Sequence, residues 1–309
     1  MKKSIYLILL IGLIISSCEK IIDIDVPDKS RKIVVNSIID PESEFSIKLT
    51  QSKSILEDNM VMILKDAEAK VFEDDALVGT MEYLDFDQYT LNNFYPSIGK
   101  SYRIEVNHPV LQSVSADISI PDPVEIIEMD TSTSIGEWGD KAYNVNIAIN
   151  DPPGRNYYAV SITLTNRVFD WGNQVFLDST ETYSAYLNTL SDTETGFGDG
   201  LVDNDLSYYI DGKLFFSDEI FSVQGDRKEL ALEYYIYSPG DSVHVDVRLD
   251  HIAPSYYFYS VSKQKYYQAD GNPFAEPVQV YSNIQNGFGL FSSYSRTSRK
   301  YSVLSEGDR

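Results

Sequence analysis

The sequence predicts an all-β protein with a single helix, and two features of its residue pattern carry this prediction. Apolar and polar residues alternate with a period of two over residues 45–49, 102–106 and 114–120, which is typical of strands that bury one face. Short intervals rich in turn-forming residues, such as Asp40-Pro41, separate these segments. Many short strands joined by turns indicate a β-sandwich.

Two units are predicted along the chain. Residues 31–121 form the first, an immunoglobulin-like or transthyretin-like β-sandwich. The sequence Pro121-Asp122-Pro123 closes it, because two prolines in three residues disfavour both a helix and a paired central strand. A second, mainly β unit is predicted over residues 124–309. Its clearest alternating segments are residues 143–149, 157–164 and 241–249.

The best helix candidate is residues 254–270. Pro254 stands at a position where a helix start tolerates proline, and Gly271 follows the last candidate residue. The segment repeats tyrosine around two lysines, as Tyr256, Tyr259, Lys263, Lys265, Tyr266 and Tyr267. The whole chain holds 23 tyrosines, a side chain that suits β-sheet surfaces and also suits sugar stacking or protein interfaces.

The N-terminus predicts export and lipidation. Lys2 and Lys3 precede an apolar run over residues 5–15, which is typical of a signal peptide and shorter than the roughly twenty residues that span a bilayer. The run ends in Ile15-Ser16-Ser17-Cys18, a lipobox, and Cys18 is the only cysteine in the chain. We therefore predict a signal peptide over residues 1–17, a lipid anchor on Cys18 and a tether over residues 18–30.

Composition restricts the partners. The chain has 25 basic and 47 acidic side chains, and removal of Lys2 and Lys3 leaves 23 against 47, a net charge of about -24. A nucleic acid would be repelled by this charge. Membrane attachment is therefore expected through the acyl chains at Cys18, and cysteine nucleophiles, disulfides and thiolate metal sites are excluded within one chain.

Catalytic motifs are sparse. The three histidines, His108, His244 and His251, have no metal-ligand spacing, and neither a GxSxG elbow nor a phosphate-binding glycine loop is present. We expect no cofactor and no catalytic residue. The alternative is an envelope hydrolase that acts on glycan or peptide through paired carboxylates. Such a hydrolase would have two convergent carboxylates in a cleft with strongly shifted pKa values, whereas a binding protein would have an aromatic or apolar surface patch.

An acidic loop over residues 191–206 is the one candidate metal site. Asp192, Asp199, Asp203 and Asp205 lie there with Gly196, Gly198 and Gly200 among them, and hard oxygen ligands on a loop suit calcium. The spacing is not that of an EF-hand. A solvated loop explains the same residues.

The C-terminal region resembles a known family. The ordered segments Gly271-Asn272-Pro273-Phe274-Ala275-Glu276-Pro277-Val278, Val280-Tyr281-Ser282-Asn283-Ile284 and Asn286-Gly287-Phe288-Gly289-Leu290-Phe291 are similar to the C-terminal signature of domain of unknown function 4249. The opening residues 32–36, the tyrosine-rich helix and the lipobox resemble it too. The resemblance implies an envelope lipoprotein of Bacteroidota-type bacteria. It also implies an accessory role beside a SusC-like TonB-dependent transporter in outer-membrane uptake, and we expect the cell-surface face, with the periplasmic face as the alternative.

Two interpretations of this signature stay open. In the structural one, Pro277 starts a strand over residues 278–281, and Asn286-Gly287 forms the tight turn of a hairpin that packs its aromatics into the core. In the functional one, the segment docks a partner or ligand. The candidate residues are Asn272, Pro273, Phe274, Glu276, Pro277, Asn283, Asn286, Gly287, Phe288 and Gly289.

Overall fold

The computed structural model describes residues 30–53, 61–136, 139–189, 207–221, 226–236, 242–270 and 274–304, and it confirms an all-β protein. The N-terminal half holds β1 (Ile33–Ile39), β2 (Ser46–Gln51), β3 (Met62–Ile63), β4 (Glu68–Glu73), β5 (Ala76–Thr80), β6 (Glu82–Asp85), β7 (Gln88–Thr90), β8 (Ser101–Asn107) and β9 (Val114–Ser119). The C-terminal half holds β10 (Ile126–Ile135), β11 (Lys141–Asn150), β12 (Tyr157–Asp170), β13 (Val175–Ser184), β14 (Asn188–Thr189), β15 (Ser207–Ile210), β16 (Lys213–Ser217), the 3-10 turn η1 (Asp218–Ile220), β17 (Arg227–Tyr234), β18 (Ser242–Ile252), α2 (Pro254–Ala269) and β19 (Phe288–Leu304). The alternating segments of the sequence coincide with β2, β8, β9, β11, β12 and β18.

The N-terminal part is a sandwich of two sheets. One sheet has the order β5-β4-β8-β9, and the other includes β1, β2, β7 and β6. Alternate residues point inward from both, so that Leu49 and Val71 are fully buried in one core. Phe45 contacts Phe291 of β19 in that core, at 6.0 Å between ring centroids. The last strand of the chain therefore contributes to the first sandwich.

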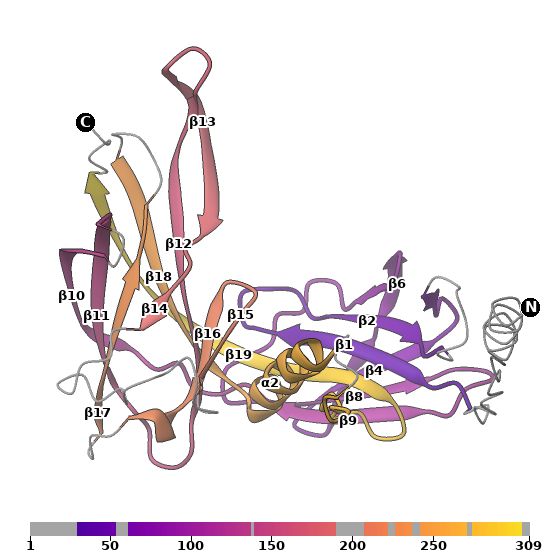
Figure 1. Ribbon diagram of the computed structural model, residues 1–309. Helices are drawn as coiled ribbons and strands as arrows, with labels where there is room; N and C mark the ends of the chain where they lie inside the picture. The colour runs from indigo at the N-terminus through magenta and orange to yellow at the C-terminus, as the bar shows by residue number, and fades with distance from the viewer. Residues whose placement is uncertain are drawn as a thin grey trace, which may run out of the picture.

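The C-terminal part repeats the arrangement. The sheet β10-β11-β17-β14 packs against β12, β18 and the end of β19. Val243, Val245, Val247 and Leu249 of β18 face this second core as the alternation predicts. Beyond the body, β12 and β13 continue as a two-stranded ribbon (Figure 1).

Strand β19 joins the two parts into one eleven-stranded sheet. Its residues 288–293 pair in parallel with β1, and its residues 294–304 pair antiparallel with β18. The 17-residue strand is roughly 55 Å long at about 3.3 Å per residue, and Figure 1 shows it running from one part into the other. The limits predicted for the two units, 31–121 and 124–309, stay a prediction, because β19 takes part in both sandwiches.

The connection between β9 and β10 follows β19. Hydroxyl groups of Ser293 and Thr297 donate to the carbonyl oxygens of Ser119 and Val124, each at 2.7 Å. Arg299 donates two hydrogen bonds to the carbonyl of Ile126. The proline-containing connection is thus fixed to the shared strand.

Helix α2 confirms the predicted tyrosine-rich helix. Pro254 is in its first turn, where the missing N–H costs no hydrogen bond. Tyr257 packs on Tyr157 at 4.7 Å between centroids, so the helix covers one end of the outer face of β12, β16 and β18. Among the described residues, no helix combines the length and the apolarity needed to cross a membrane.

Candidate functional site

The signature segment crosses from α2 to the first sandwich as a loop. The strand predicted for residues 278–281 is not present, because the N–H of Tyr281 donates to the Ser262 hydroxyl of α2, at 2.8 Å, instead of to a neighbouring strand. Glu276 and Pro277 are exposed in this loop. Several candidates lie outside the described residues: Cys18, Asp192, Asp199, Asp203, Asp205, Asn272 and Pro273.

Three hydrogen bonds, two of the Asn283 side chain and one of the Gln285 backbone, fix the second half of the loop. The Asn283 amide donates to the carbonyl of Phe291 at 2.7 Å and accepts from its N–H at 3.0 Å. It therefore substitutes for a neighbouring strand at that residue. The N–H of Gln285 donates to the carbonyl of Ser115 in β9 at 2.8 Å. The loop is attached to both sheets of the first sandwich.

The glycines of the signature permit the contact between β1 and β19. A side chain at Gly287 would begin 2.7 Å from the carbonyl oxygen of Ile33, and one at Gly289 would begin 1.9 Å from that of Val35. Gly289 and Asn286 both have positive φ, at 103° and 63°. The prediction of a hairpin at Asn286-Gly287 is wrong. The residues after this turn form β19, which pairs in parallel with β1.

Other signature residues are exposed. Phe274 is 95% exposed, and Phe288 and Tyr281 are 45% and 37% exposed. Tyr281 and Phe288 line an open depression of about 450 Å³, and Phe258 of α2 contacts Tyr281 at 5.8 Å between centroids. We call Phe258, Tyr281 and Phe288 the aromatic rim. The rim combines two partly exposed aromatics of the signature with one from α2.

The rim lies where the chain enters the first sandwich. Phe288 is the cross-strand partner of Val34 in β1, and the ammonium group of Lys32 lies 5.0 Å from the centre of the Phe288 ring. Because β1 and β19 run in parallel and β19 continues into the second sandwich, this is the end of the first sandwich farthest from the second.

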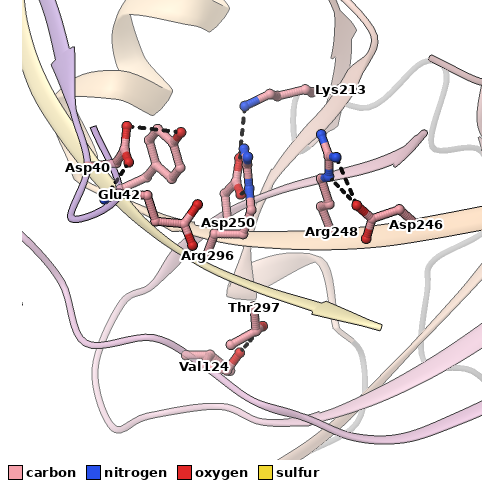
Figure 2. Close-up of polar contacts among 10 residues, drawn as sticks. Asp40, Glu42, Val124, Lys213, Asp246, Arg248, Asp250, Arg296 and Thr297 are labelled. Atoms are coloured by element: carbon pink, nitrogen blue, oxygen red, sulfur yellow. Dashed lines mark hydrogen bonds and ion pairs between the residues drawn. The ribbon is translucent and has the colours of Figure 1, made fainter. Parts of the chain in front are cut away.

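A buried group of charges lies at the junction of the two sandwiches (Figure 2). Asp250 of β18 is 1% exposed. Arg296 of β19 donates to both of its carboxylate oxygens, at 2.6 and 2.9 Å, and Lys213 of β16 donates to one, at 2.8 Å. The hydrogen bonds to Asp250 raise the pKa of Arg296. With its carboxylate surrounded by cations, Asp250 is suited to fixing three strands and not to proton transfer.

Tyr294 connects this charge group to the first sandwich. Its ring lies 4.9 Å from the Arg296 guanidinium and 5.2 Å from the Lys213 ammonium. Its hydroxyl donates to Asp40, at 3.3 Å, in the turn after β1. Burial raises the pKa of Tyr294 to about 12, so the phenol stays a neutral donor.

Sequence reasoning did not identify the charge group. The alternation in β18 assigns Asp250 to the polar face of the strand, where exposure is expected. Arg296 faces it only through the register of β18 with β19. Nothing local in the sequence signals that pairing.

The carboxylates nearest to the hydrolase pattern are Asp151 and Asp218. Burial raises the pKa of Asp151. Its carboxylate accepts from the Tyr158 hydroxyl at 2.5 Å, and Asp218 accepts from the N–H of Asn156 at 2.9 Å. Both side chains thus hold the turn between β11 and β12, and the hydrogen bonds to Tyr158 and Asn156 give each carboxylate a structural role.

The histidines are separated in the structure. His244 bonds to the Ser302 hydroxyl at 2.8 Å, and His108 lies beyond β8 in the first sandwich. His251 stacks on Tyr158, and its Nδ1 lies 2.7 Å from the carbonyl oxygen of Asp122. Within the described ranges, no three histidine, cysteine or acidic side chains are grouped to hold a metal.

His251 predicts a loss of stability in acid. Burial lowers its pKa from the ordinary 6.5, so the folded chain binds its proton less readily than the unfolded chain. The contribution of neutral His251 is therefore complete above pH 6.5 and is lost as the pH falls below that value. We expect the free energy of unfolding of the wild type to fall more on acidification than that of His251→Gln.

The measurement is urea unfolding at neutral pH and near pH 5 (about one and a half units below the ordinary histidine value). The same substitution at His108 serves as the control. An equal acid loss in the wild type and in His251→Gln would contradict the assignment of a half-buried neutral imidazole.

The geometry defines an all-β protein of two sandwiches that share one strand. An exposed aromatic rim lies beside the start of β1. The comparison with protein families assigns it further. The chain belongs to the family described as domain of unknown function, DUF4249, which matches residues 19–300, and the resemblance of the C-terminal signature is thereby confirmed. No curated protein matches the chain.

Proposed function

We propose that the protein is a non-enzymatic, lipid-anchored accessory subunit of a SusC-like TonB-dependent transporter at the cell-surface face of the outer membrane. The anchor is the acyl group on Cys18. The aromatic rim is the surface that contacts the transporter. One observation carries this proposal. Exposed aromatic side chains of the signature lie beside Lys32 and the start of β1, at the end of the first sandwich that the tether joins.

Covalent geometry supports the proximity of the rim to the membrane. Fourteen peptide bonds separate Cys18 from Lys32, and an extended chain covers at most about 3.6 Å per residue. Lys32 and the adjacent Phe288 therefore lie within roughly 50 Å of the lipid, whatever path residues 19–31 take. The far end of β19 lies up to another roughly 55 Å away.

The chemistry of the rim supports a protein partner. Aromatic side chains are enriched at the centres of protein interfaces, where they bury large areas at low entropic cost. The net charge of about -24 for the chain without Lys2 and Lys3, from 23 basic and 47 acidic side chains, opposes contact of the protein body with anionic lipid. We therefore propose that the rim contacts a membrane protein and not the lipid itself.

The test is a pull-down of the tagged, lipidated protein from native envelope in detergent, with mass spectrometry of the partners. We expect a TonB-dependent transporter in stoichiometric amount, and we expect Tyr281→Ser with Phe288→Ser to reduce its recovery by about tenfold or more, as for central interface residues. Trp171→Ser is the matched control, because Trp171 is 67% exposed on the β12–β13 ribbon, far from the rim.

Three outcomes would overturn parts of this proposal. A clean preparation without a transporter would refute the accessory role. Equal recovery with the rim variant and the wild type would refute the rim as the contact. Membrane retention of Cys18→Ala after removal of its signal would refute the lipid anchor.

A further inference from the structure

The outer face of the C-terminal sheet carries polar side chains beyond the end of α2. Cross-strand pairing arranges them in rows that run across β13, β12, β18 and β19. One row is Thr182, Thr165, His244 and Ser302, and the next is Ser184, Thr163, Asp246 and Lys300. With strands about 4.8 Å apart, each row spans roughly 14 Å. We call these eight residues, with Arg248 from the adjacent position in β18, the polar platform.

The platform is hollowed and open. Most of its members line one depression of about 570 Å³. Hydroxyl groups are preorganised at its edges, since Thr165 and Thr182 bond to each other at 2.9 Å and Ser302 bonds to His244 at 2.8 Å. The surface therefore presents oriented hydroxyl groups, an imidazole and two cationic side chains around the depression, with Val245 and Tyr301 also in its lining.

The charge of the platform is opposite to that of the protein. Acidic side chains outnumber basic ones by 47 to 25 in the chain, whereas the platform holds Arg248 and Lys300 against the single carboxylate of Asp246. Among the described residues, no carboxylate pairs with Lys300. A local cationic surface on an acidic protein concentrates anionic ligands.

The guanidinium of Arg248 is held in a fixed orientation. Asp246 accepts from its Nε at 2.8 Å and lies 2.8 Å from its Nη2 (Figure 2). The described residues offer no acceptor for Nη1, so one edge of a held guanidinium remains for a ligand. Such an oriented guanidinium favours a planar carboxylate or a sulfate over a diffuse charge.

We infer that the polar platform binds an anionic oligosaccharide, with Lys300 and Arg248 contacting its carboxylate or sulfate groups and the threonine and serine hydroxyls contacting its ring hydroxyls. The charge reversal selects an anion, and the rows of hydroxyl groups select a hydroxylated chain. This inference does not depend on the transporter contact, because the platform and the aromatic rim are on different sandwiches.

The test is calorimetric titration of the full-length protein in detergent with three hexasaccharides: oligogalacturonate, a sulfated chondroitin fragment and uncharged maltohexaose. We expect at least one anionic sugar to bind about tenfold or more tightly than maltohexaose, with affinity that falls at high ionic strength. Lys300→Glu is expected to weaken that binding by about tenfold or more, and Lys300→Arg to retain it. Lys48→Glu makes the same charge change on the exposed face of β2 and is expected to leave binding unchanged.

The two anionic sugars distinguish a carboxylate from a sulfate ligand. Binding of neither anionic sugar, equal binding of maltohexaose, or equal binding by Lys300→Glu and the wild type would each overturn the inference. None of these results bears on the pull-down, so the two proposals fail separately.

Discussion

Substitution of Gly289 by alanine is expected to destabilise the protein by more than about 4 kcal/mol, an effect of the size that diagnoses overpacking at a buried contact. The new Cβ would lie 1.9 Å from the carbonyl oxygen of Val35, and φ at this residue is +103°. The backbone of Val35 cannot move away without loss of the parallel pairing between β1 and β19. That pairing holds β19 in the first sandwich. We therefore expect the substitution to lower the stability of the first sandwich and of the whole protein.

Gly154 supplies the matched control. Its φ is +106°, and a Cβ there meets nothing within 4 Å. Gly154→Ala therefore carries the left-handed backbone cost of roughly 1–2 kcal/mol without a clash. Chemical unfolding of the two variants isolates the steric part, and equal stabilities would show that β1 and β19 do not approach as closely as the structure has them.

Asp250→Asn is the second substitution with a large expected effect. It keeps the shape of the side chain but leaves Arg296 and Lys213 without their carboxylate in a site where Asp250 is 1% exposed. Loss of one member of a buried charge group typically costs about 3–5 kcal/mol. We expect a loss of that size in the free energy of unfolding, with little dependence on ionic strength, because buried pairs are weakly screened.

Two comparisons sharpen this experiment. Asp75→Asn removes the carboxylate of an exposed pair with Arg103, in which the Asp75 side chain is 87% exposed, and should leave the melting temperature unchanged within error. A triple variant, Asp250→Leu with Arg296→Met and Lys213→Met, should recover most of the stability lost in Asp250→Asn. An Asp250→Asn protein as stable as the wild type would refute the charge group as a structural junction.

Gly289→Ala and Asp250→Asn both test the role of β19 as the strand shared by the two sandwiches. Gly289 lies where β19 joins the first sandwich, and Arg296 lies where the same strand passes into the second. If the shared strand couples the sandwiches, each variant should unfold both, and tryptophan fluorescence should report the same transition as far-ultraviolet circular dichroism.

The pattern of the sequence was sufficient for the elements. Period-two alternation located β2, β8, β9, β11, β12 and β18, because a half-buried strand needs that alternation wherever it is in the fold. Pro254 and Gly271 bounded α2 for a similarly local reason. The lipobox and the C-terminal signature are contiguous motifs, and the second sufficed to identify the family.

The partners of each strand were decided only by the tertiary structure. The aromatics of the signature suggested a hairpin, yet Gly287 and Gly289 serve a parallel contact with a strand about 250 residues earlier. Asp250 lies on the polar face that the alternation defines, and in the fold its carboxylate is enclosed by contacts with Arg296 and Lys213. The polar platform likewise exists only when four strands are in register.

The physical reason is the range of the interactions. Local backbone preference and amphipathic period act over a few residues, and the sequence by itself therefore determined the all-β class, the tyrosine-rich helix and the family. The pairing of β1 with β19, the junction charges and both candidate surfaces depend on burial and register between segments far apart in the chain. No local sequence pattern indicates these interactions, and only the folded structure decided them.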